Sequence, residues 1–256
     1  MAVKIAQGNF GKVATSSTVK TGDNNQVLTE TDLAVGKLLV SRVAQKYPLH
    51  NIIDEEAGVV DKGSEFTWVI DPIDGTSNFA VGSPHYGIMI GLLEGSTPIA
   101  GGIALPFFNK IYYAEKNKGA YCGSIKLSVS QETKLANALV AYGIDGHQEA
   151  PELTRAESKT FAEIVLAVRN IRNSGSCFDT IMVAEGKYGG YLYQSSKIWD
   201  NVAPQILLEE SGCLVTDFFG NSIDYSHPTQ KVKNNFTACA APSTLHRALQ
   251  QIIHNI

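Results

Sequence analysis

Cysteine is scarce in this 256-residue chain, and its four copies are scattered. There is no CxxC pair and no paired spacing, so nothing points to a disulfide framework or a redox motif. The six histidines show neither an HxxxH nor an HxxE spacing, which argues against a zinc site. We therefore expect reduced, mostly buried thiols, as is typical of a cytoplasmic protein.

Long hydrophobic runs and an excess of positive charge are also missing. No apolar stretch approaches the length of a membrane span, and residues 1–9 lack the apolar core of a secretory signal peptide. Lys and Arg together number 21 against 25 for Asp and Glu, which gives a formal net charge of −4. A chain of this charge lacks the basic surface that nonspecific nucleic-acid binding needs. We expect neither a membrane nor a nucleic acid among its partners.

Internal repeats, low-complexity tracts and Pro/Ser-rich linkers are absent from the sequence as well. One domain over residues 1–256 is the simplest organisation, with halves at about 1–130 and 131–256. Helical and strand patterns alternate, but the strand segments cluster in hairpins rather than in regular βαβ units. This arrangement predicts a mixed α/β (α+β) fold.

Caps and turns predict the elements of the first half. Thr29, followed three residues later by Asp32, is typical of a capped helix start. The apolar run 66–70 predicts a strand that Asp71-Pro72 would break. Short apolar runs separated by glycine over residues 86–129 predict an antiparallel meander.

The second half is predicted to alternate strands and helices. A long helix after Pro151 is expected to bury one face. Ser243 is expected to cap the C-terminal helix, and Gly212 to end the helix before it. The expected strands are 138–142, 190–193 and 237–240, and the expected shorter helices are 178–185 and 201–210. The buried face of the long helix is expected to carry Phe161, Ile164, Val165, Val168 and Ile171.

Acidic residues follow apolar runs at four places in the chain. Asp71 ends the run 68–70, and Pro72 forces a turn that brings Asp74 back towards Asp71. The others are Asp54-Glu55-Glu56 and Asp200. If these carboxylates converge, each pair at ~4 Å costs about 4 kcal/mol with an effective dielectric near 20. A fold that gathers them therefore needs a cation.

Gly75 and Thr76 come directly after this acidic turn. Their backbone N–H groups would face an anion held there, as in phosphate cradles at helix starts. Carboxylates beside such a cradle suit a hard cation that bridges protein and phosphate. A lone D-P-x-D-G is usually only a turn, so the joint occurrence of four acidic strand ends carries the metal hypothesis. Sequence alone does not show that the four places converge.

Two segments resemble the signatures of the inositol monophosphatase family. Residues 68–79, Trp-Val-Ile-Asp-Pro-Ile-Asp-Gly-Thr-Ser-Asn-Phe, match the first signature almost letter for letter. Trp199-Asp200, followed by Ala203-Pro204 and Glu210-Ser211-Gly212, resembles the second. The resemblance covers nearly the whole chain. It implies a layered α-β-α-β-α sandwich of the inositol monophosphatase and fructose-1,6-bisphosphatase type, commonly a homodimer.

The resemblance also implies roles by position. Thr76 would pair with Glu55 to orient the attacking water, with Asp71 as a further catalytic residue. Asp32 would help to hold an additional, weaker metal ion. The implied Mg²⁺ ligands are Glu55, Asp71, Asp74, Asp200 and the carbonyl of Ile73. The implied substrate contacts are the Gly75 and Thr76 amides on phosphate, and Gly175, Ser176 and Cys177 on the organic part. Two or three Mg²⁺ ions are expected, with Mn²⁺ as a substitute.

Tyr193 departs from the family pattern. Inositol phosphatases carry there a Glu that bonds sugar hydroxyls, and a phenol differs from it in length and charge. The expected substrate is therefore a small phosphorylated metabolite of open identity. Inositol monophosphate or a related polyol phosphate is one candidate, and histidinol phosphate, fructose 1,6-bisphosphate and nucleotide 3′-phosphates are alternatives. The N-terminal helix of the family is also shortened here.

The expected reaction is direct displacement by water that Mg²⁺ activates, without a covalent intermediate. A haloacid-dehalogenase type of phosphatase is a rival, but its two acids stand two residues apart, whereas Asp71 and Asp74 stand three residues apart with Pro between them. A regulatory binding protein on the same fold is a second rival, since some bacterial family members influence transcription complexes. Retention of every metal-ligand position argues against it.

Overall fold

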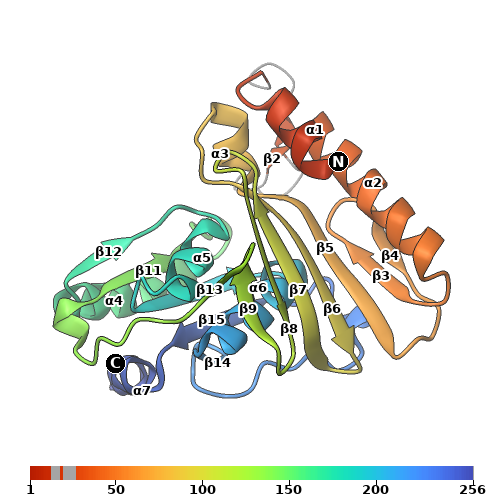
Figure 1. The fold of residues 1–256 in the computed structure, drawn as a ribbon. Helices are drawn as coiled ribbons and strands as arrows, with labels where there is room; N and C mark the ends of the chain where they lie inside the picture. The colour runs from red at the N-terminus through yellow and green to blue at the C-terminus, as the bar shows by residue number, and fades with distance from the viewer. Residues whose placement is uncertain (13–17, 20–26, 256) are drawn as a thin grey trace.

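Two β-sheets alternate with three layers of helices in the computed structural model, which describes residues 1–12, 18–19 and 27–255 (Figure 1). The larger sheet has the strand order β10-β9-β8-β7-β6-β5-β3-β4, and the smaller one β12-β11-β13-β15-β14. The larger sheet comprises β3 (Asn51–Asp54), β4 (Gly58–Val60), β5 (Phe66–Asp74), β6 (Gly87–Glu94), β7 (Thr97–Leu105), β8 (Lys110–Glu115), β9 (Gly119–Cys122) and β10 (Ile125–Lys126). The smaller sheet comprises β11 (Leu139–Gly143), β12 (Asn170–Arg172), β13 (Gly190–Ser196), β14 (Leu214–Thr216) and β15 (Phe236–Ala241). Two short strands, β1 (Thr18–Val19) and β2 (Val27–Leu28), pair with each other.

Within the described residues, seven α-helices surround and separate the sheets. They are α1 (Ala2–Asn9), α2 (Glu30–Lys46), α3 (Thr76–Val81), α4 (Pro151–Ala167), α5 (Phe178–Ala184), α6 (Ile198–Ser211) and α7 (Ser243–His254). Single 3₁₀ turns occur at Leu135–Asn137 and Pro228–Gln230. Within the described part of the chain, no helix combines the length and the apolar character needed to cross a bilayer.

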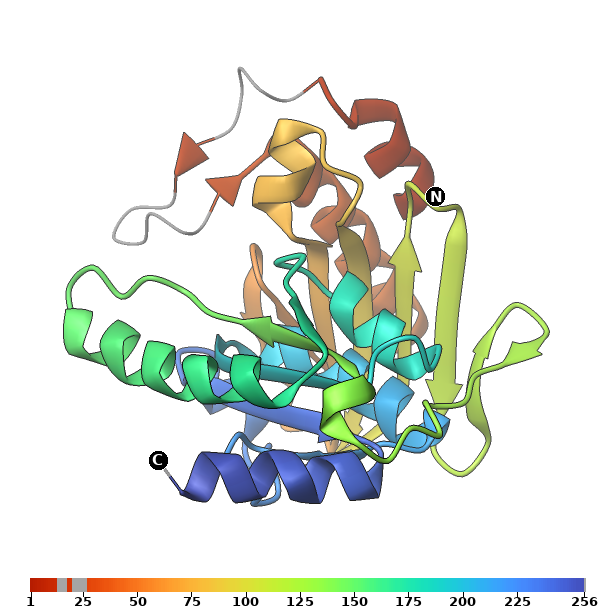
Figure 2. The ribbon, with the colours of Figure 1, turned by 90° about the vertical axis from the view of Figure 1, so that its left-hand side faces the viewer.

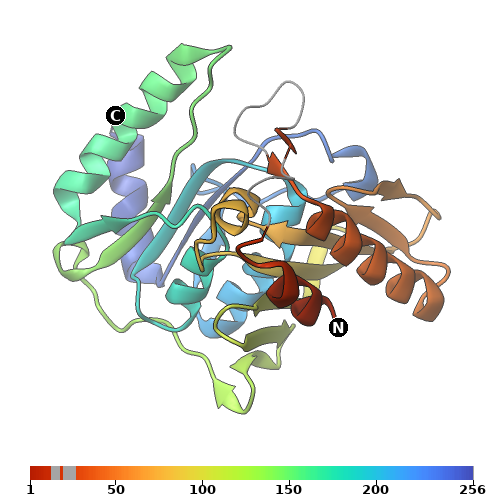
Figure 3. The same ribbon diagram turned by 90° about the horizontal axis from the view of Figure 1, so that it is seen from above.

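Alternation along the strands explains the layers around the larger sheet. Successive side chains of a strand point to opposite faces. Val69 of β5 packs with Val202 of α6, while the next residue, Ile70, packs with Val43 of α2. The larger sheet therefore lies between α2 on its outer face and α6 on its inner face, and Figure 3 shows α1 and α2 together on the outer side.

The smaller sheet is covered on both faces in the same way. Cys239 of β15 packs with Leu249 of α7, whereas its neighbour Ala240 packs with Leu207 of α6. Figure 2 shows α4 and α7 together on the outer side of this sheet, and α5 and α6 between the two sheets. The layer order is α-β-α-β-α, which confirms the expected fold class.

The helix start at Thr29 is confirmed. The hydroxyl of Thr29 accepts hydrogen bonds from the backbone N–H groups of Thr31 and Asp32, and the carboxylate of Asp32 accepts from the backbone N–H of Thr29 at 3.0 Å. This reciprocal capping box buries Asp32, which is only 1% exposed, at the start of α2.

The predicted break at Asp71-Pro72 is wrong, because β5 continues through Pro72 to Asp74. The pairing of β5 with β3 ends at Ile70, so Pro72 lies beyond the paired stretch on that side. On the other side, the register with β6 shifts between Asp71 and Asp74. Proline has no N–H to donate and is tolerated at such an irregularity.

Three predicted details of the second half also need correction. Helix α6 begins at Ile198, so Asp200 lies in its first turn and not at a strand end. Helix α4 ends at Ala167, so Ile171 lies outside it, in strand β12, where it pairs with β11. Val165 lies within α4 but is 42% exposed, so it does not belong to the buried face of the helix. Pro242 is the N-cap of α7, and Ser243 makes no side-chain capping bond. Backbone pairing between distant segments and the tertiary position of each helix decide these boundaries.

Candidate active site

Three carboxylates converge where the end of β5 meets the start of α6. One carboxylate oxygen each from Asp71, Asp74 and Asp200 lies within 4.8 Å of the others. Residues three apart on a regular strand point to opposite faces. Between Asp71, opposite Met89, and Asp74, opposite Gly87, β5 holds one residue more than β6. This bulge turns both acids towards the same cleft.

Asp200 and Glu55 reach this centre from neighbouring elements. The carboxylate of Asp200 accepts a hydrogen bond from the backbone N–H of Lys197 at 2.6 Å, which fixes it across the first turn of α6. Glu55 follows β3, and its backbone N–H donates to the carbonyl of Ile70 at 3.2 Å. Its side chain lines the cleft beside Asp71.

Burial raises the pKa values of the three converging carboxylates, and repulsion from nearby acids adds to the shift. Asp71 is 1% exposed, and its Oδ1 has no hydrogen-bond partner among the residues that the structure describes. Burial, followed by repulsion from Glu55, Asp74 and Asp200, raises the pKa of Asp71 well above its usual range. Burial raises the pKa of Asp74 to about 6, although the N–H of Cys177 opposes the shift. Burial, followed by repulsion from Asp74 and Glu55, also raises the pKa of Asp200 well above its usual range. A bound cation would stabilise the charged forms of these three side chains.

Thr76 lies beside Asp32 at the edge of the centre. Its hydroxyl is 3.0 Å from Oδ1 of Asp32 and 2.7 Å from the carbonyl oxygen of Ile73, and its single proton serves one of them at a time. The resemblance pairs Thr76 with Glu55, whereas this hydrogen bond links it to Asp32. Asp32 thus connects the capping box of α2 to the start of α3.

Gly75 adopts a left-handed conformation, and its surroundings leave no room for a Cβ atom. Its φ is +75°, and a Cβ atom there would lie 2.8 Å from Cβ of Ser176 and 2.9 Å from the carbonyl oxygen of His85. Asn78 on α3 donates to the carbonyls of His85 at 2.8 Å and Ser174 at 2.7 Å. The backbone at Gly75 and Thr76 is therefore packed against the segment 174–176. The residues of this region that line the cleft are Gly75, Thr76, Asn78, Gly175 and Ser176.

The segment before α5 is held by two carboxylates. The backbone N–H of Cys177 donates to Asp74, and the backbone N–H of Ser174 donates to Oδ2 of Asp179 at 2.7 Å. Burial, then the carboxylate of Asp74, raises the pKa of the Cys177 thiol, which favours its neutral form. Asp179 is 3% exposed and lines the cleft. No motif in the sequence singled it out.

Tyr193 lies in another part of the same cleft, which has a volume of about 1120 Å³. Its hydroxyl donates to Oδ2 of Asp145 at 2.6 Å, and burial, followed by this carboxylate, raises the pKa of Tyr193. Tyr193 pairs with Gly143 across β13 and β11, and a Cβ at Gly143 would lie 2.5 Å from the tyrosine ring. The absence of a side chain at Gly143 therefore makes room for the ring.

The structure brings nearly all the sequence-predicted site residues to one cleft, and their individual roles stay predictions. The exception is Asp32, which lies behind Thr76. The predicted residues that line the cleft are Glu55, Asp71, Ile73, Asp74, Gly75, Thr76, Gly175, Ser176, Cys177, Tyr193 and Asp200. The sequence analysis missed Asp145, His147, Glu157 and Asp179, which carry no local motif.

Comparisons with known proteins agree with this geometry. A sequence model described as the inositol monophosphatase family matches residues 1–256. The chain is 31% identical over 218 residues to a fructose-1,6-bisphosphatase/inositol-1-monophosphatase of Aquifex aeolicus, covering 83% of this chain and 80% of the relative. It is also 31% identical over 254 residues to a protein named Nus factor SuhB of Pasteurella multocida, covering 97% and 90%.

The fold is also found among solved structures. An inositol monophosphatase from Anabaena (Nostoc) sp. PCC 7120 superposes with a TM-score of 0.83 at 26% identity, covering 100% of this chain and 91% of that one. The family match spans the chain from end to end, and the relatives above 30% identity cover most of it. The chain belongs to the inositol monophosphatase family.

Proposed function

We propose that this protein is a Mg²⁺-dependent phosphomonoesterase that hydrolyses a small sugar or polyol phosphate. The observation that carries the proposal is the convergence of Asp71, Asp74 and Asp200, with one oxygen of Asp71 buried and unpartnered among the described residues. A site made only of oxygen donors fits Mg²⁺ better than zinc. Membership of the family supports phosphatase activity.

The metal ligands would be Glu55, Asp71, Asp74, Asp200 and the carbonyl of Ile73. Two or three Mg²⁺ ions would bind, with Asp32 near the weakest, and Mn²⁺ would substitute. Bound Mg²⁺ supplies an activated water and offsets the charge of the transferring phosphoryl group. Asp71 is the ligand that faces all the other acids of the centre, so its loss would disturb the site most.

Thr76 would orient the attacking water. Because its hydroxyl can donate to Asp32, a lone pair remains free to accept a proton of that water. The amides of Gly75 and Thr76 would hold the phosphate. Catalysis would thus rest on positioning and on charge stabilisation, without a covalent intermediate.

The organic part of the substrate would lie between the segment 175–177 and Tyr193. The proton of the Tyr193 hydroxyl is engaged by Asp145, so this oxygen is left to accept a hydrogen bond from the substrate. The Aquifex relative is named as a phosphatase of both fructose 1,6-bisphosphate and inositol 1-phosphate. Both compounds are therefore candidate substrates here. Gly175, Ser176 and Cys177 would contact whichever alcohol is bound.

Phosphate release from a generic monoester tests the proposal. We expect wild type to release phosphate with Mg²⁺ and to release none with EDTA. Asp71→Asn should show almost no release even at saturating Mg²⁺. Asp61→Asn is the matched control, since Asp61 is an exposed carboxylate that does not line the cleft. Equal Mg²⁺-dependent release by wild type and Asp71→Asn would contradict the assignment.

A second candidate function comes from the relatives named Nus factor SuhB. A binding role in transcription would then exist beside hydrolysis or in place of it. An Asp71→Asn protein that complements loss of such a factor, while lacking hydrolysis, would favour the binding role. Loss of both in the same variant would favour the enzyme.

Homodimerisation and a cytoplasmic location complete the proposal. The family commonly forms homodimers, and light scattering of the purified protein measures the mass directly. All four cysteines are free thiols, three of them buried, which suits a reducing compartment.

A further inference from the structure

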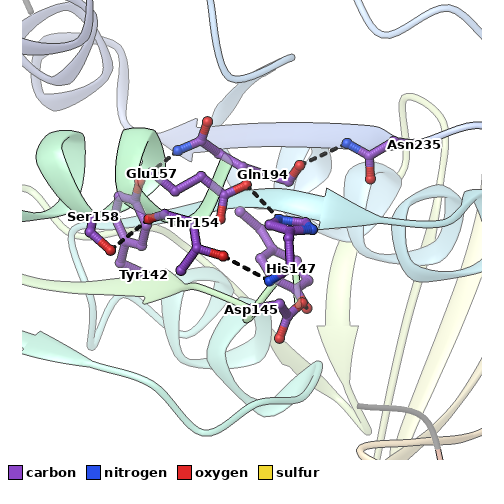
Figure 4. A network of polar contacts seen from close by, with 9 residues as sticks. Tyr142, Asp145, His147, Thr154, Glu157, Ser158, Gln194 and Asn235 are labelled. Atoms are coloured by element: carbon purple, nitrogen blue, oxygen red, sulfur yellow. Dashed lines mark hydrogen bonds and ion pairs between the residues drawn. The ribbon is translucent and has the colours of Figure 1, made fainter. Parts of the chain in front are cut away.

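The imidazole of His147 is held in the cleft by helix α4. Its Nε2 lies 3.1 Å from Oε1 of Glu157, and the backbone N–H of His147 donates to the hydroxyl of Thr154 at 2.7 Å. Figure 4 shows both contacts, one to the ring and one to the main chain. Because two residues of the same helix fix His147, its ring has a defined orientation on the wall of the cleft.

Glu157 occupies a position where α4 would otherwise carry an apolar residue. Positions 157, 161 and 164 share one face of a helix, and Phe161 and Ile164 use that face to pack on the smaller sheet. Glu157 is only 9% exposed, lines the cleft, and its Oε2 finds no hydrogen-bond partner within the described ranges. A carboxylate buried on an apolar face reduces stability unless a partner compensates, which points to a functional reason for its presence.

The neighbouring residues make this part of the cleft rich in hydrogen-bond acceptors. We name Asp145, His147, Glu157 and Tyr193 the distal wall. No arginine lines the described cleft, and Lys197, its one lining lysine, has its amino group 3.2 Å from the carbonyl of Lys233. A second phosphate placed against the distal wall would therefore meet the carboxylates of Asp145 and Glu157, whereas a hydroxyl or ammonium group would meet acceptors.

We propose that His147, oriented by Glu157, is a specificity-determining residue that accepts a hydrogen bond from a donor group on the organic part of the substrate. Glu157 accepts the Nε2–H of the ring, and this contact selects the tautomer with a free lone pair on Nδ1. Nδ1 has no hydrogen-bond partner in the described parts of the chain. The donor is a hydroxyl or a protonated amine, and the distal wall disfavours substrates with a second phosphate. The inference rests on the proposed phosphatase function and names the substrate class of that site.

The experiment compares four esters that differ beyond the phosphate. Glycerol 2-phosphate offers hydroxyl donors, phosphoethanolamine an ammonium group, fructose 1,6-bisphosphate a second phosphate, and phenyl phosphate no donor. The measured quantity is kcat/KM for each ester divided by that for phenyl phosphate. We expect His147→Leu to lower the ratio about tenfold for one of the two donor-bearing esters, glycerol 2-phosphate or phosphoethanolamine. The loss should come chiefly through KM, since one buried hydrogen bond to the substrate is lost.

Glu157→Gln is the second variant, because it keeps the shape of the side chain and removes its charge. It should lower the same ratio about threefold and raise the relative kcat/KM of fructose 1,6-bisphosphate by a similar factor. Glu152→Gln is the matched control on the same helix, since Glu152 is exposed and does not line the cleft. The ester whose ratio falls, glycerol 2-phosphate or phosphoethanolamine, identifies the donor.

Binding measurements separate this inference from the proposed function. Calorimetric titration of the same esters in Mg²⁺ needs no turnover, and melting temperatures check that each variant folds. If wild type binds without hydrolysing and the variants lose preference for the donor-bearing ester, the phosphatase proposal fails and the role of His147 stands. If folded His147→Leu and Glu157→Gln keep every binding and kcat/KM ratio of wild type, the role of His147 is overturned.

Discussion

The carboxylate centre and the distal wall are two parts of one cleft that are built in opposite ways. The centre takes Asp71 and Asp74 from one strand end and Asp200 from the first turn of a helix. Its side chains are set by a bulge and by main-chain hydrogen bonds to the acids. The distal wall instead takes His147 from a loop, where side chains of α4 hold it. The three converging carboxylates thus lie on regular elements, whereas His147, which would contact the variable organic group, lies on a loop.

The largest expected difference between the two parts is the effect of removing one charge. Asp71→Asn keeps the shape but removes the carboxylate that faces the other acids, so kcat should fall at least ~10³-fold, or about 4 kcal/mol. Steady-state hydrolysis of phenyl phosphate at saturating Mg²⁺ measures it. Activity within tenfold of wild type would mean that the centre lies elsewhere.

The second largest difference between the carboxylate centre and the distal wall should come from adding one methyl group to a glycine of each. Gly75→Ala must accommodate a φ of +75° and contacts at 2.8 and 2.9 Å, one of them to backbone. We expect a loss of about 10²-fold in kcat, because small displacements of positioning groups have effects of that size.

Gly143→Ala is the matched change at the distal wall. There the three atoms nearest to the new Cβ all belong to the Tyr193 side chain, the closest at 2.5 Å, so the ring would have to shift. Its effect should be confined to KM and to the ranking of substrates. Similar losses of kcat in both variants would remove the distinction between a catalytic and a specificity region.

Metal removal should affect stability through the centre alone. The pKa of Asp74 is raised in the folded state, to about 6, and those of Asp71 and Asp200 are raised as well. Between their unfolded and folded pKa values the native state binds more protons, so stability without metal falls as pH rises. In EDTA we expect the melting temperature to drop by several degrees from pH 5 to pH 8.

Adding Mg²⁺ should reverse this loss. At a hundredfold excess over its Kd, the gain is about 2.7 kcal/mol, and it should grow with pH as the carboxylates ionise. Differential scanning fluorimetry over pH and Mg²⁺ concentration measures both trends. A melting temperature that ignores Mg²⁺ at pH 8 would show that the acids do not share a cation. Glu157→Gln should preserve the Mg²⁺ response, because Glu157 belongs to the distal wall.

The smallest expected effect concerns Tyr193. A carboxylate there would accept two hydroxyl bonds, whereas the phenol, with its proton on Asp145, accepts a single neutral one. We expect inositol 1-phosphate to be weakly preferred, and Tyr193→Glu to change its relative kcat/KM about tenfold, or ~1.4 kcal/mol. Tyr193→Phe, which removes the hydroxyl and with it both the bond to Asp145 and the acceptor for the substrate, gives the reference without a polar group at this position. A hundredfold preference for inositol 1-phosphate in wild type, or an unchanged ranking in Tyr193→Glu, would contradict this expectation.

Sequence by itself determined the parts of the molecule that local chemistry specifies. The capping box of Thr29 and Asp32 joins residues three apart, and the segment 68–79 holds two acids and a glycine within one turn. Such features depend on a few adjacent residues, so their pattern is visible in one dimension. The layered fold followed from the same signatures by resemblance.

Tertiary structure alone decided how distant segments combine. The bulge that turns Asp71 and Asp74 to one side depends on pairing with β6, and the Tyr193–Asp145 bond joins residues 48 apart in sequence. His147 and Glu157 are only 10 residues apart, yet their contact depends on how the loop turns back onto α4. Hydrogen bonds and repulsion between side chains act over a few ångströms, and only the folded backbone sets those separations.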